Sequence, residues 1–238
     1  MIDLHSHVLP GVDDGASDED TAAAMCRIAA ADGIRILVAT PHFNAALGVT
    51  DPARVADAAD RLKRRIADEG LELELRVAAE MPLSENAVEA YRSGIWPAYD
   101  SGRCYVLLEM PPIQSGLPIL QDVIFRLRMA GATPVLAHPE RLEMLEDLRA
   151  AEQVHQQGAV FQITASCLGA PDSRSGRRAI QWLRRGWVQV VASDAHDPVR
   201  RPPGLSAARH WLREHWGEDT ADALTRVNPG KILNGEPL

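Results

Sequence analysis

Short apolar runs alternate with longer amphipathic stretches along the chain, and this alternation predicts seven strand–helix pairs. The predicted strands are residues 2–5, 36–40, 73–79, 104–109, 134–138, 160–164 and 187–193. The predicted helices are residues 17–31, 52–69, 84–93, 117–130, 144–157, 176–185 and 206–216. Ser17 and Asp51 can cap the first two helices, and Pro52 suits a first helical turn. Repeated strand–helix order predicts a parallel sheet, either a barrel or an open doubly wound sheet.

The placement of the polar residues favours the barrel. Six of the seven predicted strands end in, or are followed by, a histidine or a carboxylate. These residues are His5, His7, His42, Glu80, Glu109, His138, Asp194 and His196. An open sheet would spread them along a line, whereas a barrel gathers the carboxyl ends of its strands on one face. We therefore expect an α/β barrel that forms a single domain over residues 1–238, with a site at that face.

Composition and charge exclude several classes of partner. The 238 residues are 46% hydrophobic and carry a net charge of −8, which disfavours a general nucleic-acid binder. The chain has no polybasic segment for anionic lipids and no apolar run long enough to span a bilayer, so we expect no membrane insertion. Its first residues lack the pattern of a signal peptide. These features predict a cytoplasmic protein.

The three cysteines are odd in number and far apart, which argues against a disulfide framework and a thiolate metal site. A thiol phosphatase needs an arginine six residues after its cysteine. The residues six positions after Cys26, Cys104 and Cys167 are aspartate, methionine and serine. The chain also lacks the Gly-Lys-Ser/Thr ending of an ATP-binding loop. The sequence therefore points away from thiol and ATP chemistry.

Two short motifs near the N-terminus carry candidate metal ligands. His5 and His7 are two residues apart, so in an extended segment both imidazoles point to the same side and can reach one ion. Asp13 and Asp14 precede Gly15, and such a pair more often makes a turn than a site. Because this loop leaves a ligand-bearing strand, we favour Asp14 as a ligand and Asp13 as the turn residue.

Three further candidates follow apolar runs. His42 comes directly after Pro41, which keeps the preceding residue extended. Glu80 and Glu109 lie at the ends of apolar strands, where a carboxylate is costly unless it is paired or binds a metal. A salt bridge to a neighbouring arginine is the alternative for each glutamate.

Later in the chain, two apolar strands break abruptly into clustered ligand-type residues. His138 is followed by Arg141, and the pair Asp194 and His196 is followed by Arg201. Arginines beside metal ligands suit the bidentate recognition of phosphate, although either could be an ordinary surface residue. The other histidines lie on predicted helices without a metal-binding spacing, and we expect them to be solvated. They are His155, His210 and His215.

Taken together, these motifs resemble the PHP (polymerase and histidinol phosphatase) superfamily. They are similar, more narrowly, to its bacterial protein-tyrosine phosphatase branch, which is associated with capsule and exopolysaccharide synthesis. The matching segments are residues 3–7, 13–15, 39–42, 80, 108–109, 134–141, 192–196, 201–203 and 228–233. An aspartate at the position of Asp14 is characteristic of this branch, since other branches have a histidine there. Residues 111–118 show no clear match.

The resemblance implies a distorted (β/α)7 barrel of the PHP type with three divalent metal ions. Manganese is expected first, and zinc or iron are alternatives, in agreement with imidazole and carboxylate ligands. The implied ligands of the first ion are His5, His7, Glu80 and Asp194; of the second, Asp14, His42 and His196; of the third, Glu109, His138 and a bridging Glu80. Arg141 and Arg201 match positions that bind the phosphate.

We therefore expect a metal-dependent phosphomonoester hydrolase that uses a metal-activated hydroxide. Its expected substrate is a phosphotyrosine protein, namely a bacterial tyrosine kinase of capsule or exopolysaccharide synthesis. One alternative is a small-molecule phosphoesterase such as a histidinol-phosphate phosphatase, and another is an exonuclease, which the acidic composition disfavours. A third is a metal-binding regulatory partner of a kinase without turnover.

Overall fold

Two parallel sheets form the centre of the molecule in the computed structural model, which describes residues 1–43, 51–84, 86–95, 97–110 and 116–238. The first sheet has the order β1 (Ile2–Ser6), β2 (Ile36–Ala39), β3 (Glu74–Val77). The second has the order β4 (Glu80–Pro82), β5 (Tyr105–Glu109), β6 (Thr133–Ala137), β7 (Val160–Thr164), β8 (Val188–Ala192). Every strand pair is parallel, which confirms the predicted α/β class.

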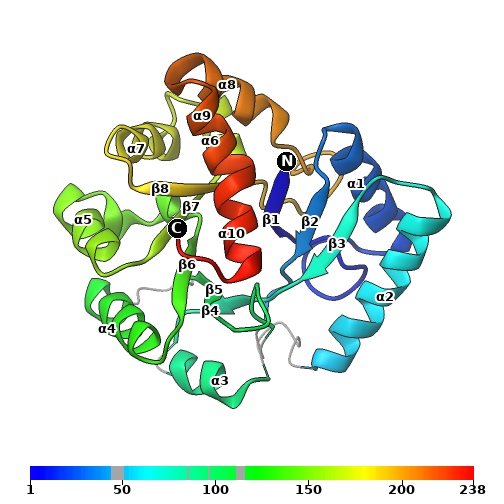
Figure 1. The fold of residues 1–238 in the computed structure, drawn as a ribbon, viewed down its shortest axis with the longest axis horizontal. Coiled ribbons are helices and arrows are strands. Elements are labelled where there is room, and N and C mark those ends of the chain that lie inside the picture. The colour runs from blue at the N-terminus through cyan, green and yellow to red at the C-terminus, as the bar shows by residue number, and fades with distance from the viewer. Residues whose placement is uncertain (44–50, 85, 96, 111–115) are drawn as a thin grey trace.

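Helices surround the sheets (Figure 1). They are α1 (Glu19–Ala31), α2 (Pro52–Asp68), α3 (Ala87–Ser93), α4 (Leu117–Met129), α5 (Leu148–Gln156), α6 (Ala165–Gly169), α7 (Arg174–Leu183), α8 (Ser206–Trp216), α9 (Glu218–Asp222) and α10 (Asn228–Asn234). Two 3-10 turns, η2 (Pro139–Arg141) and η3 (Glu143–Leu145), follow β6, and a π-helical segment, η4 (Ala223–Val227), precedes α10. Asp51 caps α2 as expected, whereas Asp18 rather than Ser17 caps α1 by accepting from the Thr21 amide at 2.8 Å.

The predicted third strand, residues 73–79, corresponds to β3, which ends two residues earlier, at Val77. A further strand, β4, follows after two residues and belongs to the other sheet, so Glu80 begins a strand instead of following one. The chain leaves the first sheet between Ala78 and Ala79. The Ala78 amide still donates to the Ala39 carbonyl of β2, but the Ala79 amide donates to the Pro97 carbonyl. The chain therefore changes pairing partners between two small residues, a change that an apolar run in the sequence does not reveal.

Two isolated bridges join the two sheets. Between β1 and β8, Ser6 and Ala195 form a parallel bridge, and the His7 amide donates to the Ala195 carbonyl at 2.8 Å. Between the ends of β2 and β4, His42 and Glu80 form a second parallel bridge. The first bridge lies at the carboxyl ends of β1 and β8, and the second joins the segment after β2 to the first residue of β4. Candidate ligands from the two sheets are thereby held side by side.

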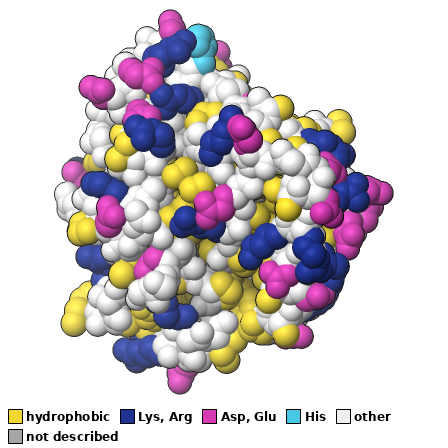
Figure 2. Space-filling model, turned by 45° about the vertical axis from the view of Figure 1, so that its right-hand side comes forward, with side chains coloured by type: hydrophobic (Ala, Val, Ile, Leu, Met, Phe, Trp, Pro, Cys, Tyr) yellow, Lys and Arg dark blue, Asp and Glu magenta, His cyan; other side chains and the backbone are white. Residues whose placement is uncertain are grey.

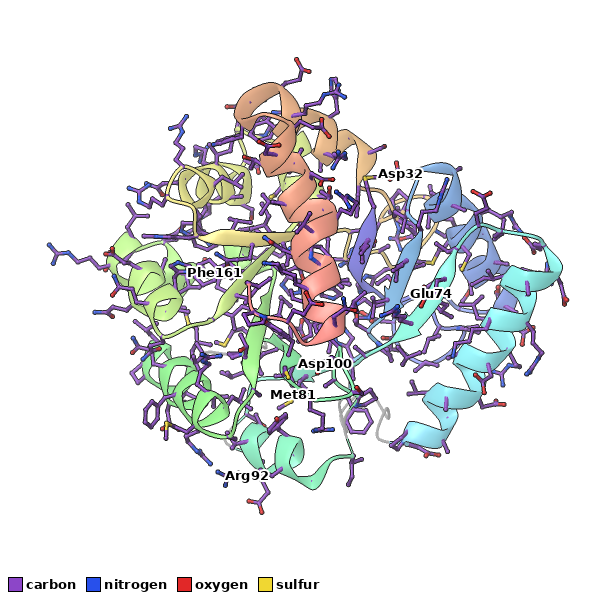
Figure 3. All side chains as sticks on the ribbon, in the orientation of Figure 1. Asp32, Glu74, Met81, Arg92, Asp100 and Phe161 are labelled. Carbon is purple, nitrogen blue, oxygen red and sulfur yellow. The ribbon has the colours of Figure 1, made fainter. Side chains whose placement is uncertain are left out.

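Two apolar clusters stabilise this arrangement. The larger one lies between the strands and the outer helices and includes Phe161 and Met81, both labelled in Figure 3. The smaller one lies between the inner faces of strands of both sheets and includes Leu4, Leu107 and Val190. The α10 side chains Ile232 and Leu233 join this inner cluster, and α10 lies across the middle of the strands in Figure 1.

The C-terminal helical segment α9–α10 was missed by the sequence pattern, because Pro229 and Gly230 interrupt the apolar periodicity. Proline is tolerated here since it occupies the first turn of α10, where its missing amide hydrogen would have no helical partner. Acidic and basic side chains are intermingled on the face of the molecule seen in Figure 2. Among the described residues, no helix is both long and apolar enough to cross a membrane.

Candidate metal centre

Nine side chains converge on one side of the two sheets. Eight come from the carboxyl halves of strands or from the loops that follow them, and Glu80 is the first residue of β4. They form four overlapping groups, in each of which the potential ligand atoms lie within 4.8 Å of one another. The groups are His7–Asp14–His42–His196, His5–Glu80–His138, His5–His7–Asp194 and His42–Glu80–Glu109. Within the part of the chain that the structure describes, the groups contain all nine ligands predicted from the sequence and no other residue.

Glu80 lies at the centre of the cluster and is fully buried. Its Oε1 atom is 3.3 Å from Nε2 of His5 and 3.5 Å from Nε2 of His138. Its Oε2 atom is 3.3 Å from Nε2 of His7 and 3.1 Å from Nδ1 of His42. Burial raises the pKa of Glu80, but the facing imidazoles outweigh it and hold that pKa well below its usual range. Neither oxygen makes a hydrogen bond within the described residues, so both suit a bridging metal ligand.

The two adjacent aspartates have different surroundings. Asp14 is half-exposed, and its Oδ1 atom lies 3.4 Å from Nε2 of His42 and 3.6 Å from Nε2 of His196. Asp13 is buried and accepts from the Gly15 amide at 3.1 Å, as a turn residue does. The structure thus brings Asp14 into the cluster and puts Asp13 in the turn.

Asp13 also orients a candidate ligand, a role the sequence did not reveal. Its Oδ2 atom is 2.7 Å from Nδ1 of His7, which leaves Nε2 of that ring facing Glu80. Gly15 packs directly on His7, since a Cβ added to Gly15 would lie 1.9 Å from the His7 carbonyl oxygen. Carboxylates that bind the second ring nitrogen of a metal-ligating histidine fix its tautomer and orientation.

Gln162 has the same role for His5 and was also missed. It lies in β7, the strand for which no ligand was predicted, and its Oε1 atom is 2.8 Å from Nδ1 of His5. A fully buried glutamine within the apolar run of β7 is the signal that could have identified it. Strand β7 therefore contributes an orienting group where six of the predicted strands contribute ligands.

His138 and Asp194 have left-handed backbone conformations, with φ values of 35° and 55°. His138 comes directly after β6, and Asp194 is the second residue after β8. A non-glycine residue in this region costs about 1–2 kcal/mol, and such strain clusters at functional sites. The sharp turn lets each side chain point into the cluster at the point where its strand ends.

Both predicted arginines contact the cluster through one carboxylate. Nη2 of Arg141 and Nη2 of Arg201 lie 2.8 Å and 2.6 Å from the same Asp194 oxygen, Oδ2. The other oxygen, Oδ1, is 3.5 Å from Nε2 of His5. Burial raises the pKa of Asp194, but the surrounding histidines and these arginines lower it overall. The half-exposed guanidinium groups thus lie beside the candidate metal ligands, where they can hold an anion.

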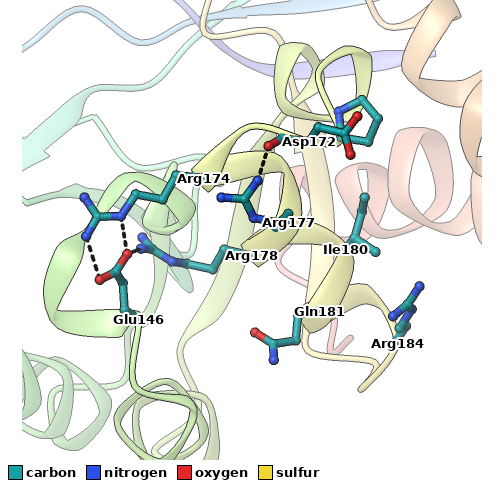
Figure 4. A pocket seen from close by; sticks show the side chains of 9 residues that line it. Glu146, Asp172, Arg174, Arg177, Arg178, Ile180, Gln181 and Arg184 are labelled. Carbon is teal, nitrogen blue, oxygen red and sulfur yellow. Dashed lines mark hydrogen bonds and ion pairs between the residues drawn. The ribbon is translucent and has the colours of Figure 1, made fainter.

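A buried arginine fixes the segment that carries Arg141. Arg178 of α7 is 6% exposed, and its Nη1 atom donates at 2.7 Å to the carbonyls of Glu140 and Leu142, on either side of Arg141. Its Nη2 atom donates to Glu146 at 2.6 Å. Figure 4 shows Glu146 between Arg174 and Arg178 at the edge of a surface groove. Arg178 therefore acts as a positioning residue behind Arg141.

Replacing Arg178 by methionine is expected to lower kcat/KM for an aryl phosphate by about 10- to 100-fold, mostly through KM. The reason is that the segment around Arg141 loses both of its carbonyl anchors. Arg177→Met, at the exposed neighbouring position, is the control and should leave both constants unchanged. Steady-state kinetics with metal content as a second readout checks this. Equal effects of the two substitutions would contradict the positioning role.

The pKa values of three of the clustered imidazoles lie above the usual value for histidine. Burial lowers the pKa of His7, but Asp13 and Glu80 raise it to about 10. Facing carboxylates likewise raise the pKa of His5 and His42 against the effect of burial. His196 differs, because burial and the nearby His7 lower its pKa to about 4.

Metal binding should therefore release protons and tighten as the pH rises. Only neutral imidazole binds a metal, and the raised pKa of His7 and its neighbours means that protons compete with the ion below their pKa values. Between about pH 6 and pH 8 we expect the apparent Kd for Mn²⁺ to fall about tenfold per pH unit for each proton released. Calorimetry in buffers of different ionisation enthalpy measures the proton count. A Kd that does not change with pH would contradict this prediction.

The remaining histidines and the cysteines lie outside the cluster. His210 and His215 are on α8, but the expectation that His155 is solvated is wrong, since its ring stacks on Trp187 with 5.9 Å between ring centroids and its Nδ1 atom is buried. Burial raises the pKa of the Cys26 thiol to about 12 and also raises that of Cys167. Neither thiol is therefore suited to act as a nucleophile. Of residues 111–118, for which the sequence offered no role, 111–115 lie outside the described residues.

Comparisons with known proteins agree with this geometry. The family model described as "Capsular polysaccharide synthesis, CpsB/CapC" matches residues 1–234. Tyrosine-protein phosphatase YwqE of Bacillus subtilis is 30% identical over 241 residues, covering 100% of this chain and 93% of that protein. Tyrosine-protein phosphatase CpsB of Streptococcus pneumoniae is 27% identical over 240 residues, with 98% of each chain covered.

A solved structure also matches along the whole chain. It belongs to a study of YwqE and CpsB, described as unique metal-dependent tyrosine phosphatases. The TM-score is 0.90 at 28% identity, and the match covers 100% of this chain and 96% of the other. The resemblance inferred from the motifs is confirmed: this chain belongs to the CpsB/CapC family of capsular polysaccharide synthesis.

Proposed function

We propose that this chain is a metal-dependent protein-tyrosine phosphatase, formed by a single domain of residues 1–238. The observation that carries this proposal is the position of Asp194 between two sets of groups. One of its oxygens faces clustered imidazoles, and the other is shared by Arg141 and Arg201. Such an arrangement can hold a metal and a phosphate side by side. The family membership and the names of its relatives support the same activity.

We further propose that the centre holds three divalent ions, with manganese expected first and zinc or iron as alternatives. The proposed ligand sets are His5, His7, Glu80 and Asp194; Asp14, His42 and His196; and Glu109 and His138 with a bridging Glu80. The donor set of imidazoles and carboxylates without thiolate suits these metals. When bound, such ions lower the pKa of water to about 7 and neutralise charge on the phosphoryl group.

The protein's own groups then have separate tasks. Arg141 and Arg201 bind phosphoryl oxygens and set the orientation of phosphorus, while Asp194 keeps both guanidinium groups at the edge of the metal centre. Asp13 and Gln162 hold His7 and His5 in the orientation that presents Nε2 to the centre. The leaving phenolate of tyrosine, with a pKa of about 10, is a better leaving group than an alkoxide and needs less help from a general acid.

We infer that the two sheets act as one distorted (β/α)7 barrel, in which β3 and β4 together count as one bent strand. The bridges at both seams and the inner cluster shared by both sheets support this inference. We place the protein in the cytoplasm, where a tyrosine kinase of capsule or exopolysaccharide synthesis would be its phosphorylated partner. The capsular family and the low thiol content are in keeping with this placement.

One comparison of substrates tests the proposed function. Phosphate release is measured in the presence of Mn²⁺ from a phosphotyrosine peptide, from histidinol phosphate and from a DNA 3′-phosphate end. We expect the phosphotyrosine peptide to be preferred and a chelator to abolish turnover. A preference for histidinol phosphate would favour a small-molecule phosphoesterase, and binding of Mn²⁺ without any turnover would favour a regulatory role.

A further inference from the structure

A cavity of about 640 Å³ opens beside the metal centre between α6 and α8. Arg141 and Arg201, the two arginines that contact Asp194, also line this cavity. Beyond them its walls include the apolar side chains Leu168, Ala207 and Trp211. The cavity is therefore continuous with the proposed phosphate site, yet its walls are of a different chemical character.

We propose that this cavity binds an apolar side chain of the substrate protein, aromatic or large aliphatic, that lies close in sequence to the phosphorylated tyrosine. The proposal rests on the proposed function, because it takes the phosphate to be bound at Arg141 and Arg201. In this proposal, the cavity is what lets the protein prefer protein substrates to small phosphomonoesters.

The distribution of charge favours an apolar occupant over a second phosphate. Three arginines line the cavity. Arg141 and Arg201 lie beside the metal ligands and are the ones that the phosphate would occupy, whereas Arg200 is exposed and its Nε atom lies 3.7 Å from a carboxylate oxygen of Asp197. The carboxylate at the cavity, Asp32, already accepts hydrogen bonds from the amides of Leu205 and Ser206 at 2.6 and 2.9 Å. Asp32 thus caps the start of α8.

The size of the cavity agrees with this assignment. Ligand cavities of about 300–1,000 Å³ with mostly apolar walls and a few placed polar groups are typical of specific recognition. The phosphotyrosine side chain is held at the metal centre by its phosphate, so the volume past the arginines is left for a neighbouring residue. By contrast, the groove in Figure 4 contains neither Arg141 nor Arg201, and its Arg174 and Arg178 are already paired with Glu146.

The test uses phosphotyrosine peptides in which each position within three residues of the phosphotyrosine is either phenylalanine or serine. For the wild-type protein with Mn²⁺, we expect phenylalanine at one position to raise kcat/KM by about tenfold or more. Ala207→Trp fills the cavity from the exposed side of α8 and should remove this preference. Its kcat/KM for p-nitrophenyl phosphate should remain unchanged. Glu214→Trp, two turns further along α8 and outside the cavity, is the matched control and should keep the preference.

Three results would overturn the proposal. The first is a wild-type protein that turns over every peptide at the same rate. The second is an Ala207→Trp variant that keeps the preference for phenylalanine. The third is an equal loss toward peptides and p-nitrophenyl phosphate, which would mean that the cavity belongs to the phosphate site itself. Failure of the proposed function looks different, because the wild-type protein would then release no phosphate from any of the peptides, whether or not it hydrolyses p-nitrophenyl phosphate.

Discussion

Replacing Glu80 by glutamine is expected to lower phosphate release from a phosphotyrosine peptide by about 10³-fold or more while the chain stays folded. Glu80 is the only carboxylate within 3.5 Å of four imidazoles, those of His5, His7, His42 and His138, among the described residues. Glutamine keeps the volume of the side chain but removes its charge. The bridging ligand between the proposed metal positions would be lost.

The measurement has two parts. Metal content by mass spectrometry should fall in Glu80→Gln, and circular dichroism should show the wild-type helix content. Asp100→Asn is the matched control, because Asp100 is also a buried carboxylate but lies at the amino end of β5, where it accepts from the amides of Cys104 and Tyr105. It lies beside the C-terminal end of α10 (Figure 3). A folded Glu80→Gln protein with full metal content and near-normal turnover would exclude the proposed centre.

Replacing Arg141 or Arg201 by alanine is expected to reduce kcat/KM by about 10- to 100-fold each, since a charge-assisted hydrogen bond contributes about 1.5–3 kcal/mol. The two effects should not add. Both guanidinium groups contact Oδ2 of Asp194, so after the first substitution the remaining arginine has that oxygen to itself and can move toward it. Neighbours that share a partner typically show coupling energies of about 0.5–3 kcal/mol.

A double-mutant cycle with Arg141→Ala, Arg201→Ala and the combined variant measures this coupling. Inhibition by inorganic phosphate supplies a second readout, and its inhibition constant should rise in each variant because the same groups bind the product. Arg149→Ala, an exposed arginine on α5, is the control and should behave like the wild-type protein. Unchanged phosphate inhibition in both single variants would mean that the arginines serve only to hold Asp194.

The ligands could be recognised from sequence because a histidine or carboxylate directly after an apolar run is a local feature. His138 and Asp194 each end such a run, and in a parallel sheet the ends of all strands lie on one side. The same logic located Arg141 and Arg201. The ligands and the two arginines could be expected to lie close together because the carboxyl ends of parallel strands share one side of a sheet. No knowledge of the packing was needed for this expectation.

The orienting groups could not be recognised in this way. Asp13 is a plausible turn residue in sequence, and only the folded loop brings its Oδ2 atom to His7. Gln162 and Arg178 are separated from their partners by 157 and 36–38 residues. Hydrogen bonds over such distances in sequence follow from how strands and helices pack, which no local pattern encodes.

The change of sheet between β3 and β4 has a related cause. Residues 77–79 are small or β-branched apolar residues, and nothing in them marks the change from β2 pairing to β5 pairing. That change depends on which strands lie on either side. It matters for the site, because it turns Glu80 into the first residue of β4 and aligns it with His42.

By itself, the sequence determined the α/β class, the family and the nine side chains that converge, because each depends on the type and order of neighbouring residues. The tertiary structure alone decided which groups orient His5 and His7, which oxygen of Asp194 faces the arginines, and that an apolar cavity begins behind them. These features depend on distances between atoms that are far apart in the chain. They are set by the packing of both sheets and the surrounding helices, and an apolar run is compatible with many such packings.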